Sequence, residues 1–171
     1  MRLFFLAAAL FACASPLAGS ADPMPPTTQP DDCAAPPAGT LVAQGCRTLD
    51  DFMTTFNSRD PQKWAATLNF PHVRLAGGQV VVWETPADYA KANDLTAFAQ
   101  GGWAYSRWDW RHLVQASDDK LHFTVQFTRY KQDGTKIASF ESLYIVTKQA
   151  GHWGVAARSS YAGIAKPGAA F

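Results

Sequence analysis

Four long strand-like runs, separated only by short turns, occupy the C-terminal part of the sequence. The second run, residues 120–131, alternates between apolar and polar side chains. Its apolar positions are Leu121, Phe123, Val125 and Phe127. Alternation with period two is typical of a strand that has one face in the core and one wetter face. Because short turns join strands that are neighbours in a sheet, we expect an antiparallel meander. The runs are 105–116, 120–131, 136–149 and 152–161, with turns at 117–119, 132–134 and 150–151.

Helical signals precede the meander. Four apolar residues recur at the spacing i, i+3, i+4, i+7 and predict a first amphipathic helix. They are Leu49, Phe52, Met53 and Phe56. Asp60-Pro61 is a capping residue followed by proline, which predicts the beginning of a second, short helix. This helix carries Trp64 and Leu68 on one face, and Asn69-Phe70-Pro71 stops it.

A hairpin and a third helical region complete the expected fold. The β-rich runs 72–76 and 79–84 flank Gly77-Gly78, a two-residue hairpin signal. Thr85-Pro86 begins the third helical region, for which a break at 93–94 is one interpretation. Helices followed by a long run of strands indicate an α+β fold. We therefore expect three helical segments packed on an antiparallel sheet of about six strands.

The N-terminus has the order of a secretory signal. Arg2 is followed by an apolar run at 3–12 and by small residues at 18–21. Residues 1–21 are thus predicted to be a signal peptide that exports the protein to the periplasm or the medium. The apolar run is too short for a membrane span. The tetrapeptide that ends at Cys13 also resembles a lipobox, so a lipid anchor on Cys13 is the alternative processing.

The mature chain is predicted to hold one domain and one disulfide. Two cysteines, Cys33 and Cys46, remain after cleavage. An even number of cysteines in an oxidising compartment suggests that they are bonded, with two unpaired thiols as the alternative. Residues 22–40 are rich in proline and are interpreted as a linker, 41–164 as the domain and 165–171 as a tail.

Charge and motifs exclude several function classes. The chain has 15 basic and 14 acidic residues, so nucleic-acid binding through a basic surface is unsupported. The four histidines are scattered and no metal-ligand spacing occurs, so no metal site is expected. Phosphate-binding and nucleophile-elbow motifs are absent from the sequence. We predict no cofactor.

Several short motifs stand in the expected elements: Phe56-Asn57-Ser58-Arg59-Asp60 with Trp64, Phe70-Pro71-His72-Val73-Arg74, Phe140-Glu141-Ser142-Leu143-Tyr144, Trp153-Gly154-Val155 and Ala157-Arg158-Ser159-Ser160-Tyr161. Together with the order of the elements, they resemble the nuclear transport factor 2-like (NTF2-like) superfamily, in its SnoaL-like or ketosteroid-isomerase-like branch. The resemblance implies a strongly curved sheet that forms a cone, a pocket at its open end, and often a dimer through the outer sheet face. It does not fix the chemistry, because the fold supports both enzymes and binding proteins.

Four polar residues are candidates for a site in the cone. Glu141 is the better candidate for a pocket carboxylate, and the alternative is an ion pair across the sheet, with Arg158 as the expected partner. His72 and Arg74 share one face of the first strand, where a histidine can move a proton and an arginine can hold a carboxylate or phosphate. The alternative for both is a solvated edge strand. Arg158 is either a ligand clamp or part of a structural ion pair.

The aromatic residues give the remaining candidates, with core packing as the alternative for each. The candidates for ligand contact are Trp64, Trp83, Tyr89, Trp108 and Tyr161. Three functional readings follow. The first is an exported domain that binds a small, mainly apolar molecule without catalysis. The second is an isomerase, dehydratase or hydrolase, with Glu141, His72 and Arg158 as acid, base and clamp. The third is a homodimeric interaction module with a filled cone, and a cavity of a few hundred Å³ would disfavour it.

Overall fold

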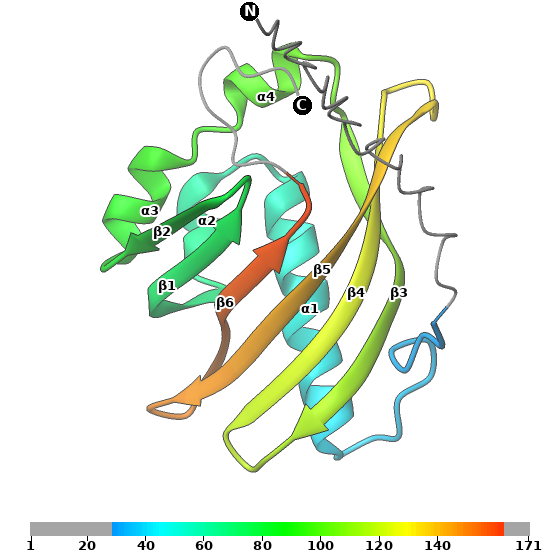
Figure 1. Cartoon of the computed structure of the whole chain (residues 1–171), viewed down its shortest axis with the longest axis vertical. Helices are drawn as coiled ribbons and strands as arrows, with labels where there is room; N and C mark the ends of the chain where they lie inside the picture. Colours follow the sequence, from blue (N-terminus) through cyan, green and yellow to red (C-terminus); the bar gives the residue numbers. More distant parts are fainter. Residues whose placement is uncertain (1–28, 163–171) are drawn as a thin grey trace, which may run out of the picture.

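The computed structural model describes residues 29–162 as four helices and one six-stranded sheet (Figure 1). The elements are α1 (Leu41–Asn57), α2 (Pro61–Ala65), β1 (Leu68–Ala76), β2 (Gln79–Trp83), α3 (Pro86–Ala92), α4 (Thr96–Gln100), β3 (Tyr105–Ala116), β4 (Lys120–Tyr130), β5 (Lys136–Gln149) and β6 (His152–Ser160). The expected signal peptide, Cys13 and the C-terminal tail lie outside the described residues. The four helices and the six-stranded sheet confirm the predicted α+β class. Within residues 29–162, no helix has the length and apolar character that crossing a membrane requires.

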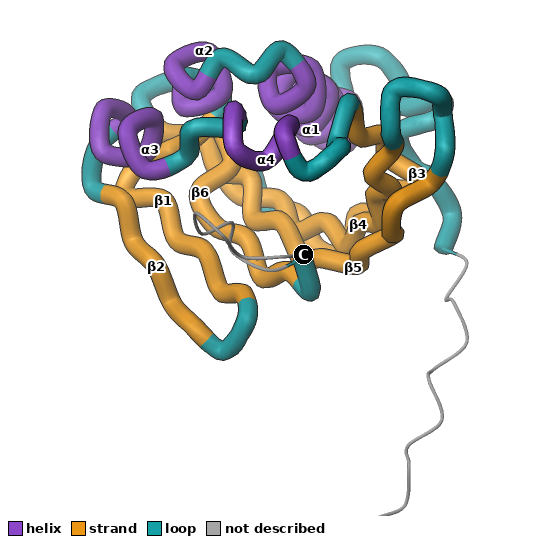
Figure 2. Tube along the Cα trace, turned by 90° about the horizontal axis from the view of Figure 1, so that it is seen from above, coloured by secondary structure: helices purple, strands orange, loops and turns teal. Residues whose placement is uncertain are grey.

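The sheet has the strand order β2-β1-β6-β5-β4-β3. The meander β3 to β6 is antiparallel throughout, as the alternating pattern predicts. The expectation of a wholly antiparallel sheet is wrong, because β1 runs parallel to β6. The last strand of the meander inserts beside β1, and that closes the core between the hairpin and the meander. The resulting sheet is mixed and curved, and the helices lie over one of its faces (Figure 2).

Helix α1 crosses the curved sheet and supplies most of the helical half of the core. Its Thr40 cap accepts a hydrogen bond from the backbone N–H of Ala43. Leu49, Phe52 and Phe56 are buried on one stripe, as the helical spacing predicts. The helix approaches β4 closely at Gly45, where a Cβ atom would come within 3 Å of β4 side chains.

Two element boundaries differ from the expectation. The second helix ends at Ala65, and Leu68 belongs to β1 and not to that helix. The reason is pairing with the last strand: Leu68 lies beside Val155 in the parallel ladder, and the N–H of Val155 donates to the carbonyl of Thr67. The third helical region is divided into α3 and α4 on either side of 93–95.

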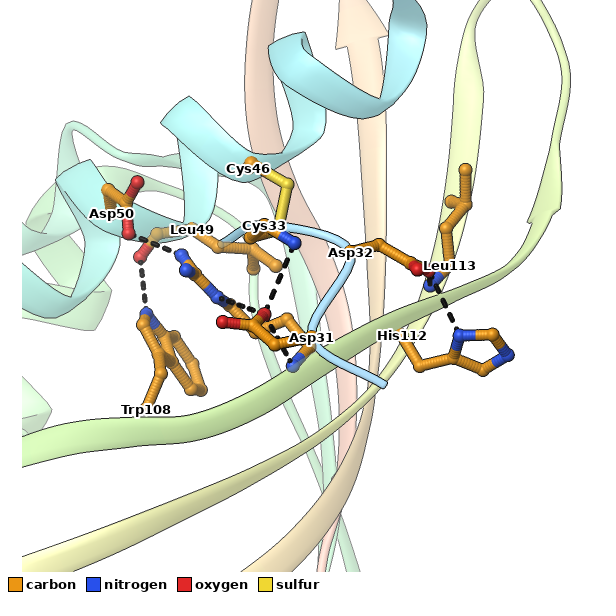
Figure 3. A network of polar contacts seen from close by, with 10 residues as sticks. Asp31, Asp32, Cys33, Cys46, Leu49, Asp50, Trp108, His112 and Leu113 are labelled. Carbon is orange, nitrogen blue, oxygen red and sulfur yellow. Dashed lines mark hydrogen bonds and ion pairs between the residues drawn. A yellow bond between two sulfur atoms is a disulfide. The ribbon is translucent and has the colours of Figure 1, made fainter. Parts of the chain in front are cut away.

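The predicted disulfide between Cys33 and Cys46 is present and ties the segment before α1 to that helix (Figure 3). We refer to residues 29–40 as the N-terminal strap. The Asp32 carboxylate accepts hydrogen bonds from the backbone N–H of Leu113, at 2.8 Å, and from Nδ1 of His112, at 2.9 Å. This part of the expected linker is therefore packed against β3. Hydrogen bonds of its side chains hold it there, and a proline-rich composition does not reveal them.

Candidate functional site

A small cavity lies between α1, α2 and the inner face of the sheet. Its volume is about 40 Å³, and it is partly open to solvent. Five aromatic side chains line it: Phe52, Phe56, Trp64, Phe127 and Tyr144. Three arginines also line it: Arg74, Arg129 and Arg158. No aspartate or glutamate is among the described residues of the lining, so the wall is aromatic and cationic.

Arg158 of β6 is the central polar residue of this cavity. Only 6% of its surface is exposed. Its Nε donates to Nε2 of His72 at 3.2 Å, and its Nη2 donates to the Tyr89 hydroxyl at 3.0 Å. The guanidinium also lies over the ring of Phe52, 5.1 Å from the ring centre. Within residues 29–162, its hydrogen-bond partners are uncharged groups.

His72 is buried completely on β1, which excludes the alternative of a solvated edge strand. Its Nδ1 lies 2.8 Å from the carbonyl oxygen of Val155, and its Nε2 accepts from Arg158. A ring that donates at Nδ1 and accepts at Nε2 is the neutral imidazole. Burial, and next the charge of Arg158, lower the pKa of His72 to about 3. At neutral pH His72 therefore orients Arg158 as an uncharged acceptor.

Tyr89 and two tryptophans surround this pair. Tyr89 is fully buried, and burial raises the pKa of its phenol to about 12, so the hydroxyl stays neutral. Trp83 stacks on His72 with ring centres 6.0 Å apart, and Trp64 meets Tyr89 edge-on at 5.1 Å. Trp64 thus lines the cavity, whereas Tyr89 contacts the lining residues without lining the cavity itself. Trp83 packs against the ring of His72.

The other two arginines come from strands on either side of the cavity. Arg74 and Arg158 are direct partners in the β1–β6 ladder and lie on the same face. Burial, with a second contribution from the Arg158 charge, lowers the pKa of Arg74 to about 10. Burial likewise lowers the pKa of Arg129 to about 10. Both side chains remain charged at neutral pH.

Sequence reasoning did not identify Arg129 as a site residue. The signal was in the β4 alternation, because position 129 continues the series of inward positions that ends at Phe127. Arg129 lies over the rings of Phe98 and Phe140, at 4.7 and 4.6 Å from their centres. An arginine at an inward position of an otherwise apolar strand face indicates a polar cavity.

The expected ion pair between Glu141 and Arg158 is wrong. The partner of Arg158 across the ladder is Tyr144, three positions from Glu141, so the two side chains point to opposite faces of the sheet. Glu141 borders a shallow groove on the outer face, together with Tyr161. Glu141 and His72 therefore do not share a site in this structure.

The remaining two aromatic candidates take different places. Trp108 is half-buried, and its Nε1 donates to the carbonyl of Leu49 at 3.2 Å, which fixes α1 against β3 (Figure 3). Tyr161 is 85% exposed beside the outer groove. Neither of them is among the cavity residues.

A comparison with protein families gives one match that spans most of the described chain. The family described as NTF2-like protein (DUF6841) matches residues 46–162. No curated protein matches the sequence.

Solved structures of similar fold have low sequence identity. A calcium/calmodulin-dependent protein kinase II association domain from Xanthomonas campestris superimposes with a TM-score of 0.58 at 18% identity, covering 84% of this chain and 100% of that one. A ketosteroid isomerase-like protein from Erwinia carotovora gives 0.51 at 20% identity, over 67% and 90% of the two chains. An NTF2-like protein from Cytophaga hutchinsonii gives 0.54 at 15%, over 71% and 98%. These likenesses support the fold and not a shared activity.

Proposed function

Since the chain belongs to the NTF2-like family whose model matches residues 46–162, we propose that it binds a small, mainly apolar molecule inside its cone. The observation that carries this proposal is the cavity between α1, α2 and the sheet, with its five aromatic side chains. Pockets with aromatic walls and a few convergent polar groups are the usual small-molecule sites of proteins. The volume of about 40 Å³ holds about three water-sized groups, so the inserted part of the ligand is small.

The proposal is tested by NMR, through the indole N–H resonances of the six tryptophans in 15N-labelled protein. The resonance that disappears in the W64F variant is that of Trp64. A panel of neutral and anionic molecules of three to six non-hydrogen atoms is titrated into the labelled protein. We expect at least one to shift the Trp64 signal in a saturable way, because Trp64 lines the cavity. The exposed Tyr161→Phe variant should bind equally well. A panel that shifts no signal of Trp64 contradicts the proposal.

A homodimeric interaction module is a second candidate, and the outer face of the hairpin favours it. Leu75, Val80 and Val82 are exposed there, and Val80 retains 66% of its surface. Leu75 is the ladder partner of Val80, so their side chains are neighbours on the bare face of the sheet. The small cavity volume also suits a largely filled cone. A second copy of the chain would cover this face, and ligand binding and dimerisation are compatible.

Export is part of the proposed function. The N-terminal signal pattern suggests it, and the Cys33–Cys46 disulfide suits an oxidising compartment. The intact mass of the exported protein tests the proposal: cleavage after Ser20 or Ala21 is expected. A diacylglyceryl mass on Cys13 would replace that cleavage with lipoprotein processing. A mass that retains residues 1–21 would contradict both.

A further inference from the structure

The charge of Arg158 is buried among neutral groups. Its hydrogen-bond acceptors include His72 and Tyr89, and the pKa values of both keep them uncharged near neutral pH. Its other contacts are with the rings of Phe52, Trp64 and Tyr144, at 5.1, 5.5 and 5.9 Å. A buried cation is stabilised best by an anion. No aspartate or glutamate among the described residues forms an ion pair with Arg158.

Two further guanidinium groups lie close to Arg158. Arg74 is the direct ladder partner of Arg158, and like charges directly opposite each other repel. Arg129 adds a third guanidinium to the same wall. No Asp or Glu in the described part of the chain lines the cavity.

Trp64 supplies an independent observation. Only 3% of this residue is exposed, and its Nε1–H has no hydrogen-bond acceptor within residues 29–162. A buried donor without a partner is costly, and an acceptor in the cavity would remove the cost. Trp64 lines the same cavity as Arg158, and the Arg158 guanidinium lies 5.5 Å from the centre of the Trp64 ring.

The size and the walls of the cavity restrict the anion. A volume of about 40 Å³ accommodates only a few non-hydrogen atoms. Phe52, Phe56 and Phe127 offer apolar surface beside the arginines. A planar monoanion with a short alkyl part satisfies both the donors and the apolar walls, whereas a hydrated dianion such as phosphate leaves the aromatic surface unmatched.

We propose that the cavity is a carboxylate-binding site, in which a short-chain carboxylic acid places its carboxylate against Arg158 and the Trp64 indole N–H and its alkyl part against the phenylalanines. The inference rests on the proposed function, because it names the chemical class of the ligand for the same cavity.

The test compares propionate with propionamide, a neutral molecule of nearly the same shape, at constant ionic strength. The readout is again the Trp64 indole signal, supported by the thermal shift of the full chain. We expect saturable binding of propionate and at least tenfold weaker binding of propionamide. Inorganic phosphate should compete at least tenfold less well than propionate.

Three variants connect the binding to the cavity. W64F removes only the indole donor and its ring edge, and should weaken propionate binding several-fold, measured by thermal shift. R158Q, checked by circular dichroism for folding, should abolish the preference for propionate over propionamide, and W64F carries the test if R158Q does not fold. R107Q changes an exposed arginine outside the cavity and should leave binding unchanged.

The outcomes separate the two proposals. Equal binding of propionate and propionamide at Trp64 overturns the carboxylate site and leaves the small-molecule function in place. Stronger binding of phosphate than of propionate also overturns it, in favour of an inorganic anion. Propionate binding that W64F leaves unchanged overturns it as well, because the bound anion then lies elsewhere. If neither these probes nor the wider panel affects Trp64, both proposals fail.

Discussion

His72 makes the stability of this protein depend on pH in a range where few other groups titrate. Burial lowers its folded-state pKa to about 3, from 6.5 in the unfolded chain. The unfolded state therefore takes up the proton first as the pH falls, so the stabilising contribution is present above pH 6.5 and is lost progressively toward pH 3. We expect the free energy of unfolding to fall by about 2 kcal/mol between pH 6.5 and 5, where most carboxylates are still ionised. Urea titrations at several pH values measure it.

A glutamine variant isolates the histidine contribution. H72Q should be less stable at pH 7, but its stability should change little between pH 6.5 and 5. H122Q changes a histidine on the opposite face of β4 and should keep the slope of the natural protein. An unchanged slope in H72Q would show that another group causes the pH dependence.

At the scale of single residues, the sequence predicted inward positions better than partners. His72, Arg74 and Arg158 were named as candidates, and all three are buried in one region. The expected Glu141 partner was wrong because pairing depends on the register between β5 and β6, and a shift of one residue turns a side chain to the other face. Whether Glu141 or His72 takes part in catalysis stays a prediction.

At the scale of elements, the crossing of α1 over β4 depends on the absence of a side chain at Gly45. A Cβ atom there would lie 2.6 Å from the Phe123 ring and 2.7 Å from Leu121. Alanine has the better helix propensity by about 1 kcal/mol, but overpacking costs about 1–3 kcal/mol. We expect G45A to lower the free energy of unfolding by up to about 2 kcal/mol. R47A, on the exposed side of the same helix, should stay within about 0.5 kcal/mol in the same urea titration. A stabilised G45A would mean that α1 can move away from the sheet.

The N-terminal strap is held by the Cys33–Cys46 disulfide and by Asp31 and Asp32, whose carboxylates bind β3. The cysteines are 13 positions apart. In the chain-entropy model, a disulfide that closes a loop of this length stabilises the folded state by about 3 kcal/mol. We expect the C33A/C46A variant to lose about 2–4 kcal/mol, and the backbone N–H of Leu113 to exchange faster with solvent. Reductant should destabilise the natural protein and leave the double variant unchanged. Equal stability of the two proteins would mean that the aspartates alone hold the strap.

The sequence predicted strands better than their arrangement. The runs 105–116 and 136–149 match β3 and β5, because alternation and turn residues are local signals. The parallel pairing of β1 with β6 joins residues 84 to 87 positions apart, so no local pattern reports it. Leu68 was assigned to a helix for the same reason, since its strand conformation is fixed by Val155.

At the scale of the whole molecule, the helices cover one face of the sheet and leave the other face bare (Figure 2). Leu75, Val80 and Val82 are 46%, 66% and 47% exposed on the β1–β2 hairpin, which forms one edge of the sheet. Apolar residues that cluster on a strand edge are a contact site or an aggregation hazard. In a two-fold dimer, each copy contributes the same patch. Such a dimer buries these residues in both copies and forms a closed assembly.

We therefore expect the protein to be a dimer when its mass is measured by light scattering after size exclusion. V80E places a charge at the centre of the patch, and two copies of it would face each other across the two-fold axis, so this variant should be monomeric at the same concentration. V114E changes a valine of similar exposure, 51%, on the opposite edge of the sheet and should remain dimeric. Circular dichroism should show both variants folded, because neither position is in the core. A natural protein that is monomeric at all concentrations, or a V80E dimer as tight as the natural one, would remove this face as the interface.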